Sequence, residues 1–173
     1  MTDKKEKILS SALELFANEG VNATSTSKIA KIAGVSEGLI FRHFNNKKGL
    51  LDALIESAEE KANALFADIL KQKDAKAVIK KTIDFPFLIK TSEYDYWRLQ
   101  FKLKWEEEYN NPKKMKPLLD KLTWAFTELN YHFPDLEAQY ISQTLASIST
   151  EILKGNLHNQ KEFRQFLTDK YSV

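Results

Sequence analysis

The chain has 173 residues, carries a formal net charge of +2 and contains no cysteine. Its length fits one domain, or a small module joined to a larger one, and is sufficient to bury a core without disulfides. The missing cysteine excludes disulfides, thiolate metal sites and cysteine nucleophiles. Because the chain has neither a signal-type apolar segment nor a run of about 20 apolar residues, we expect a soluble, cytoplasmic protein.

Helix-forming residues dominate the sequence, which has only five glycines and four prolines. Apolar residues recur at helical spacing and do not alternate as they would in strands, so the pattern predicts an all-α protein. The first helix is predicted at residues 3–18, where Ile8, Ala12, Leu15 and Phe16 form an apolar stripe. Gly20 lies just past its end, in a position typical of the residue that stops a helix.

Two short helices are predicted at residues 26–33 and 37–43, joined by a tight turn. Gly34 can adopt the backbone conformation that ends the first of these helices, and Ser36 can cap the second. Two helices joined in this way form a helix-turn-helix, in which the first helix braces the second. The second helix is about 10 Å long, so its amino-terminal end can enter the major groove of DNA.

The outward side of residues 37–43 carries the candidate DNA-reading positions. Ile40 and Phe44 are four residues apart and are expected to face the core. Amino-terminal residues of this helix would then read bases, while hydroxyl and ammonium groups on both flanks would hold phosphates. The candidate DNA contacts are Thr24, Ser25, Thr26, Ser36, Glu37, Gly38, Leu39, Phe41, Arg42, His43 and Lys47.

Simpler interpretations of these residues remain open. Residues 24–48 carry five basic residues and one acidic residue, which suits a nucleic-acid surface but also an ordinary solvated face. Thr24, Ser25 and Ser36 could serve only as helix caps. The combination of short helices, a tight turn, hydroxyls at both helix starts and basic flanks favours DNA binding.

Residues 20–51 read GVNATSTSKIAKIAGVSEGLIFRHFNNKKGLL. This segment resembles the amino-terminal DNA-binding module of TetR-family transcriptional regulators. Two positions depart from the family pattern: Phe41 stands where a tyrosine hydroxyl typically meets a phosphate, and Leu39 where threonine is frequent. The positions that match the pattern in order are Gly20, Thr24, Ser25, Ile29, Ala30, Ala33, Gly34, Val35, Ser36, Ile40, His43, Phe44, Lys47 and Leu50.

The resemblance implies a helix-turn-helix DNA-binding domain at residues 1–46 and a helical ligand-binding and dimerisation domain at residues 47–173. A helix at residues 47–71 would connect the two domains. Similar proteins are dimeric regulators, most often repressors, that a small-molecule effector releases from a palindromic operator. Further helices are predicted at about residues 74–91, 93–109, 113–132, 135–154 and 160–171, with Pro86 bending or interrupting the first of them.

Aromatic residues are concentrated in the middle of this second domain. Twelve of the twenty aromatics fall between Phe85 and Phe133. They either form the core of a helical bundle or line an apolar cavity, as in many ligand sites. The resemblance implies a pocket for a hydrophobic or amphipathic small molecule. The candidate pocket residues are Phe85, Phe87, Tyr94, Trp97, Phe101, Trp105, Trp124 and Phe126.

The last two predicted helices carry apolar residues at helical spacing. In similar proteins this region forms a four-helix interface across a two-fold axis; the alternative is that it completes the core of the monomer. A homodimer would present two heads about 34 Å apart, or a multiple of that, to a palindromic site. The candidate interface residues are Tyr140, Ile141, Leu145, Ile148, Ile152, Phe163, Phe166 and Leu167.

Catalysis is not indicated by any motif in the sequence. His43, His132 and His158 lie in different predicted elements, and no phosphate loop, His-Glu-x-x-His motif or nucleophile elbow occurs. We therefore expect no enzyme activity, no cofactor and no metal site. The remaining alternative is a helical ligand-binding or interaction protein whose head has lost DNA binding.

Overall fold

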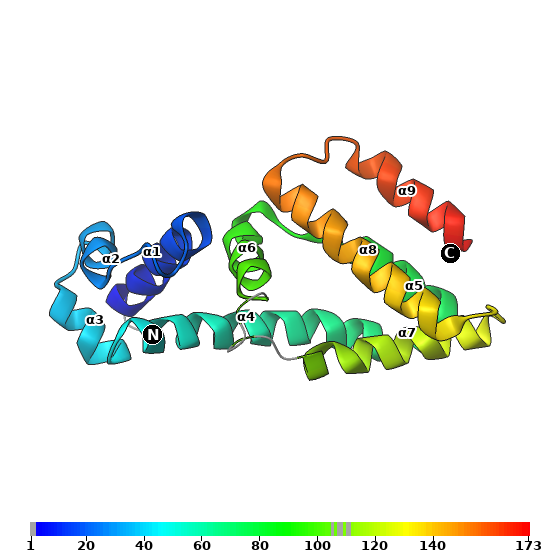
Figure 1. The fold of residues 1–173 in the computed structure, drawn as a ribbon, viewed down its shortest axis with the longest axis horizontal. Coiled ribbons are helices and arrows are strands. Elements are labelled where there is room, and N and C mark those ends of the chain that lie inside the picture. The colour runs from blue at the N-terminus through cyan, green and yellow to red at the C-terminus, as the bar shows by residue number, and fades with distance from the viewer. Residues whose placement is uncertain (1–2, 105, 107–108, 110–111) are drawn as a thin grey trace. The chain divides into compact units, whose positions relative to one another are not determined.

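A computed structural model describes residues 3–104, 106, 109 and 112–173 (Figure 1). Within these residues every regular element is helical, which confirms the predicted all-α class. Of the described helices, none is long and apolar enough to cross a membrane. The elements are α1 (Asp3–Glu19), α2 (Thr26–Ala33), α3 (Glu37–Phe44), α4 (Lys47–Leu70), α5 (Ala75–Asp84), α6 (Tyr94–Leu103), α7 (Lys116–Glu128), α8 (Pro134–Lys154) and α9 (Gln160–Tyr171), with 3₁₀ helices η1 (Phe85–Leu88), η2 (Thr91–Glu93) and η3 (Pro112–Met115).

Three predicted helices are shorter in the structure than in the sequence analysis. The helix expected at residues 74–91 ends at Asp84, and Pro86 lies in η1. Proline interrupts the helix as predicted, because its nitrogen has no N–H to donate to the carbonyl four residues earlier. The helix expected at residues 93–109 ends at Leu103.

The helix expected at residues 113–132 is α7, which ends at Glu128. Asn130 has a left-handed backbone with φ 57°, and the following Tyr131 N–H donates to the Phe126 carbonyl at 3.0 Å. A left-handed residue closed by such a bond is a common way to end a helix. Asparagine adopts this conformation more readily than most residues, which explains the earlier end.

Tertiary contacts divide the chain into two compact units. The head unit comprises Met1–Ala62 and Ser92–Asn110, and the body unit comprises Asn63–Thr91 and Asn111–Val173. The helix α6, which the sequence analysis assigned to the ligand-binding domain, therefore belongs to the head unit. The functional boundary expected between residues 46 and 47 stays a prediction.

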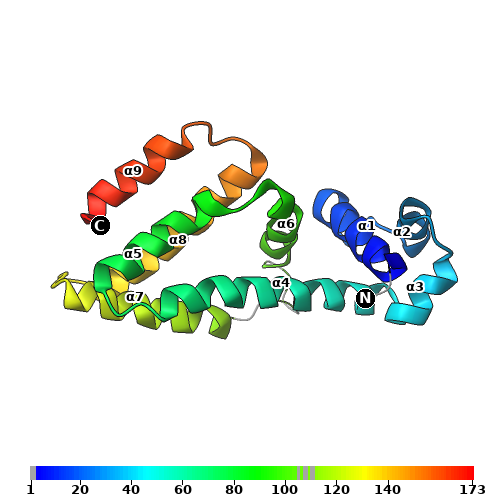
Figure 2. The same cartoon turned by 180° about the vertical axis from the view of Figure 1, so that it is seen from behind.

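The core of the head unit is formed by α1–α4 and α6. Side chains from all five helices form one buried cluster, which includes Phe16 of α1, Ile29 of α2 and Ile40 of α3. Leu99 and Leu103 on α6 complete it, and α6 packs directly against α1 (Figure 2). Since α3 is too short to be stable alone, its position depends on this core.

The body unit is held together by α5, α7, α8 and α9. The helix α7 packs against α5 and α8, and α9 packs against α5. The Phe126 ring lies 4.9 Å from the Tyr131 ring and 5.7 Å from the Tyr171 ring, measured between centroids. Burial and the nearby Glu137 carboxylate raise the pKa of both tyrosines, so their hydroxyls stay protonated at neutral pH.

Candidate nucleic-acid interface

The turn between α2 and α3 is built on Gly34. Its backbone is left-handed, with φ 65° and ψ 38°, and the Val35 N–H donates to the Ala30 carbonyl at 3.0 Å. Side chains with a Cβ resist this conformation, which explains the glycine at the turn. Because the turn is this tight, only three residues separate the end of α2 from the start of α3, and the predicted helix-turn-helix is confirmed.

The start of α2 is organised by two hydroxyl groups. Ser25 accepts a hydrogen bond from the Lys28 N–H at 3.1 Å, so it caps the helix, as the simpler interpretation held. The Thr24 side chain is 1% exposed, and its hydroxyl donates to the Gly20 carbonyl at 2.8 Å. The predicted phosphate contact of Thr24 is therefore corrected, because its hydroxyl is buried and already bonded.

The first turn of α3 is tied to the start of α2. The Thr26 hydroxyl donates to the Glu37 carboxylate at 2.6 Å, which brings together two residues predicted to contact DNA. Ser36 occupies the N-cap position, but its side chain makes no capping hydrogen bond within the described chain. This corrects the expected cap and leaves the exposed Ser36 hydroxyl available to a phosphate.

Inward and outward faces of α3 are arranged as expected. Ile40 and Phe44 are buried, whereas Gly38, Phe41 and Arg42 are exposed. The Phe41 ring is 46% exposed, so it is accessible to another molecule.

Leu39 and His43 on α3 are half-buried, whereas Ile32 on α2 is exposed. Leu39 packs partly against the head core, and His43 is also half-buried, so both present only part of their side chains to solvent. Ile32 on α2 is apolar but 50% exposed. The eight-residue helix buries only the narrower stripe of Ile29, Ala30 and Ala33.

The basic residues around the helix-turn-helix are not equivalent. The Lys28 ammonium forms an ion pair with Glu19 at 2.6 Å, and Lys48 pairs with Asp52 at 3.6 Å. Lys47, predicted to hold a phosphate, donates instead to the carbonyl oxygens of Val21 at 3.0 Å and Thr24 at 3.1 Å. The exposed guanidinium of Arg42 is the positive charge that α3 itself presents to solvent.

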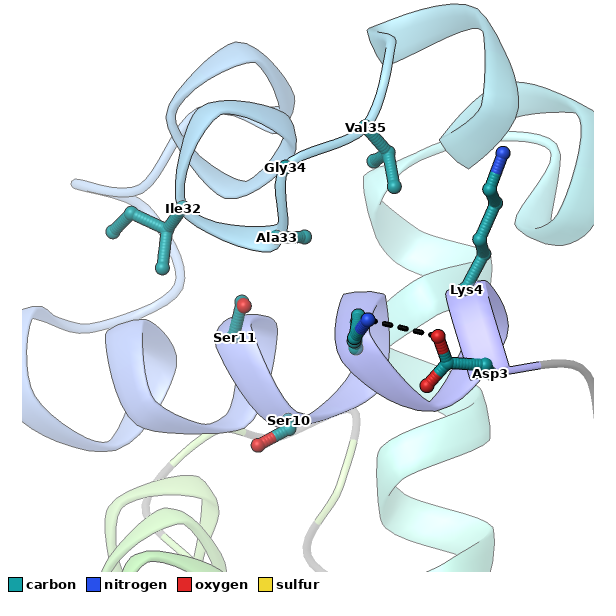
Figure 3. Close-up of a pocket in the computed structure, with 9 residues that line it drawn as sticks. Asp3, Lys4, Ser10, Ser11, Ile32, Ala33, Gly34 and Val35 are labelled. Atoms are coloured by element: carbon teal, nitrogen blue, oxygen red, sulfur yellow. Dashed lines mark hydrogen bonds and ion pairs between the residues drawn. The ribbon is translucent and has the colours of Figure 1, made fainter.

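A shallow groove of about 470 Å³ lies between α1 and the end of α2 (Figure 3). Lys7 and Asp3 form an ion pair of 2.8 Å along one wall, and Ile32 and Val35 contribute apolar side chains from the opposite helix and the turn. The charges of the groove are thus partly neutralised. Its lining residues are Asp3, Lys4, Lys7, Ser10, Ser11, Ile32, Ala33, Gly34 and Val35.

The predicted ligand-pocket residues are divided between the two units. Phe126 is fully buried in the body core, so for this ring the simpler interpretation as a core residue holds. Trp105 lies outside the described residues. The others are half-buried and stay candidates: Phe85, Phe87 and Trp124 in the body unit, and Tyr94, Trp97 and Phe101 in the head unit.

Most of the predicted interface residues complete the monomer's own core. Five of the eight are buried, so they are corrected to core positions: Ile141, Leu145, Ile148, Ile152 and Leu167. Tyr140 and Phe166 are 55% and 59% exposed, whereas Phe163 is half-buried. Phe133 and Leu136, omitted from the candidates, are 59% and 60% exposed. The spacing of Leu136 and Tyr140 on one face of α8 was the sequence signal for this surface.

The fold defines a class of protein: a helix-turn-helix unit carrying an exposed recognition helix, joined to a second helical unit. Comparison with known proteins agrees with this class. Residues 8–54 match the sequence profile of bacterial regulatory proteins of the tetR family. This segment of the chain is therefore similar to the tetR family, and the described part of the chain has the fold of solved proteins titled TetR-family regulators.

Sequence similarity is concentrated in the same segment. The chain is 46% identical over 55 residues to YvkB, an uncharacterised HTH-type transcriptional regulator of Bacillus subtilis, an alignment that covers 32% of this chain and 29% of YvkB. The matched part thus spans less than a third of that relative's length.

Structural similarity extends over nearly the whole chain. A TetR-like transcriptional regulator from Rhodococcus sp. RHA1 superimposes with a TM-score of 0.77 at 13% identity, covering 95% of this chain and 91% of the other. The regulator FadR from Bacillus subtilis, solved with stearoyl-CoA, gives a TM-score of 0.69 at 22% identity and covers 95% of each chain. At these identities the likeness establishes the fold.

Proposed function

We propose that this protein is a sequence-specific DNA-binding regulator of transcription, a dimeric cytoplasmic repressor that a small molecule releases from a palindromic operator. The observation that carries the proposal is the orientation of α3. Ile40 and Phe44 anchor it in the head core, while Gly38, Phe41 and Arg42 remain exposed on the opposite side. A short helix held in this way can place its first turns in a major groove.

The effector is expected to be hydrophobic or amphipathic. The half-buried rings of Phe85, Phe87 and Trp124 supply apolar contact area in the body unit. The structurally similar FadR was solved with stearoyl-CoA, an amphipathic molecule, which supports the same ligand class here. Differential binding of the effector to two head arrangements would change operator affinity by about 5–150-fold.

Operator binding is tested by selecting duplexes from random DNA with the purified protein. We expect one palindromic sequence to be enriched, with an affinity that falls as salt rises because phosphate contacts release counterions. The Arg42→Ala variant should bind the selected duplex about tenfold more weakly, since Arg42 is the exposed cation of α3. Electrophoretic mobility shift titrations measure both effects.

A matched control is Lys73→Ala, which removes an exposed positive charge from the body unit and should leave operator affinity within about twofold. Recovery of unselected sequences only, with the protein folded, would refute the proposed function. That result would favour the alternative of a helical ligand-binding or interaction protein.

Dimerisation is expected through the exposed apolar side chains of the body unit. Phe133, Leu136 and Tyr140 lie at the start of α8, and Phe166 lies on α9. A second copy of the chain is the occupant that would also give two heads for a palindrome. Paired Leu136→Glu and Tyr140→Glu substitutions should convert the dimer to a monomer, because buried unpaired carboxylates oppose association.

Sedimentation equilibrium measures this change in mass. The control pair is His158→Glu and Asn159→Glu, which adds the same two charges at exposed positions of the body unit between α8 and α9, outside the proposed surface. Equal masses for the two double variants would mean that this surface is not the dimer interface.

A further inference from the structure

The connection between α1 and α2 is held by lysines from two other helices. The first, Lys102 on α6, donates to the carbonyl of Ala17 at 2.5 Å and to that of Asn18 at 3.2 Å. These carbonyls belong to the last turn of α1, whose own residues include no basic side chain there. An ammonium group at this end satisfies unpaired carbonyls and complements the negative end of the helix dipole.

The second lysine, Lys47 at the start of α4, acts a few residues further along. Its ammonium donates to the carbonyl oxygens of Val21 and Thr24, which lie five and two residues before the start of α2. An ammonium group has three donors, so two of the three are committed to the protein's own backbone. The Lys47 side chain is also half-buried, which keeps it in this position.

A continuous series of contacts leads from these lysines to the proposed DNA-binding face. The Thr24 hydroxyl donates to the Gly20 carbonyl, and Ser25, the next residue, caps α2. Thr26 then donates to Glu37 in the first turn of α3. The position of residues 17–24, called here the α1–α2 segment, therefore sets the starting points of both helices of the helix-turn-helix.

We infer that Lys47 and Lys102 are positioning residues for DNA recognition: they fix the α1–α2 segment, and Lys102 makes operator selectivity depend on α6, a helix without any predicted DNA contact. This inference rests on the proposed function. It assigns Lys47 a role different from a phosphate contact. A displacement of α6 would then be transmitted to α2 through the hydrogen bonds from Lys102 to the carbonyls of Ala17 and Asn18.

The inference is tested with Lys47→Met and Lys102→Met, which keep the aliphatic stem and remove the ammonium group. The probes are the duplex selected by the wild-type protein and a scrambled duplex of equal length. Each variant should lose about tenfold in the ratio of the two affinities, because each loses two charge-assisted hydrogen bonds. Unfolding of a fraction of the protein lowers both affinities equally, so it leaves this ratio unchanged.

Salt dependence separates positioning from phosphate binding. A lysine that holds a phosphate contributes about one unit to the slope of log affinity against log salt. We expect the slope of both methionine variants to equal the wild-type slope. A slope reduced by about one unit in Lys47→Met, with the affinity ratio intact, would overturn the inference for Lys47.

Two further variants complete the design for α6. Lys102→Arg retains N–H donors for the α1 carbonyls and should restore most of the selectivity. Lys104→Met removes an exposed charge from the end of the same helix and should have no effect on the ratio. If Lys102→Met behaved like Lys104→Met, the inference for Lys102 would be wrong.

Hydrogen exchange provides a readout that does not depend on DNA. Amides of residues 20–25 should exchange faster in Lys47→Met and Lys102→Met than in Lys104→Met, because the segment loses its anchors. Equal exchange in all three variants would overturn the inference. If the wild-type protein selected no DNA sequence but the exchange result held, the proposed function would fail while the anchoring of the segment would stand.

Discussion

Replacing Ile40 by alanine is expected to destabilise the head unit by about 2–5 kcal/mol and to abolish selective operator binding. Ile40 is 0% exposed, and with Phe44 it is one of the two buried residues that attach α3 to the core. Alanine leaves a cavity that the surrounding helices fill only partly. Native-state hydrogen exchange of α2 and α3 amides measures the loss within the head unit.

The matched control is Phe41→Ala, one position further along α3. Because the Phe41 ring is 46% exposed, its removal should change head stability by less than about 0.5 kcal/mol. Any loss of operator affinity in this variant would then report a contact with DNA and not a loss of folding. Equal exchange protection of α3 in Ile40→Ala and in the wild type would contradict the assigned core position.

Replacing Phe126 by alanine should destabilise the body unit by about 3–5 kcal/mol. Its ring is 0% exposed and contacts the rings of Tyr131 and Tyr171, which join the end of α7 to α9. Loss of the ring should therefore lower exchange protection in α7 and α9, and should reduce the near-ultraviolet circular dichroism of the tyrosines.

Trp124→Ala provides the comparison for this variant. The Trp124 ring is half-buried and lies 3.9 Å from the Lys121 ammonium, a contact that contributes about 0.5–1 kcal/mol at exposed sites. Removing this larger side chain should thus cost less than removing Phe126. The reverse order would mean that Trp124, and not Phe126, is at the centre of the body core.

The helix-turn-helix could be predicted almost completely from the sequence because its determinants are local. Gly34 ends α2, and Ile40 and Phe44 recur at helical spacing, so three residues within one short segment specify the turn and the inward face. The candidate DNA-reading residues are then the positions of α3 that do not face the core. Ser36 is the local exception, since its expected cap is not formed within the described chain.

The candidate interface was the least predictable part. Ile141 and Tyr140 are adjacent in sequence and both apolar, yet one is 1% exposed and the other 55%. Helical spacing identifies apolar residues but does not say whether a neighbouring helix or a second chain covers them. The membership of α6 in the head unit was missed for a related reason: helical spacing does not show which unit Leu99 and Leu103 pack against.

By itself, the sequence determined the helical class, the tight turn and the outward residues of α3, because each depends on side chains within a few positions of one another. Only the tertiary structure decided that Thr24 is buried, that Lys47 faces backbone carbonyls and that Lys102 reaches Ala17, 85 positions away. Such partners are set by the packing of distant helices, and no local pattern encodes which carbonyl an ammonium group will meet.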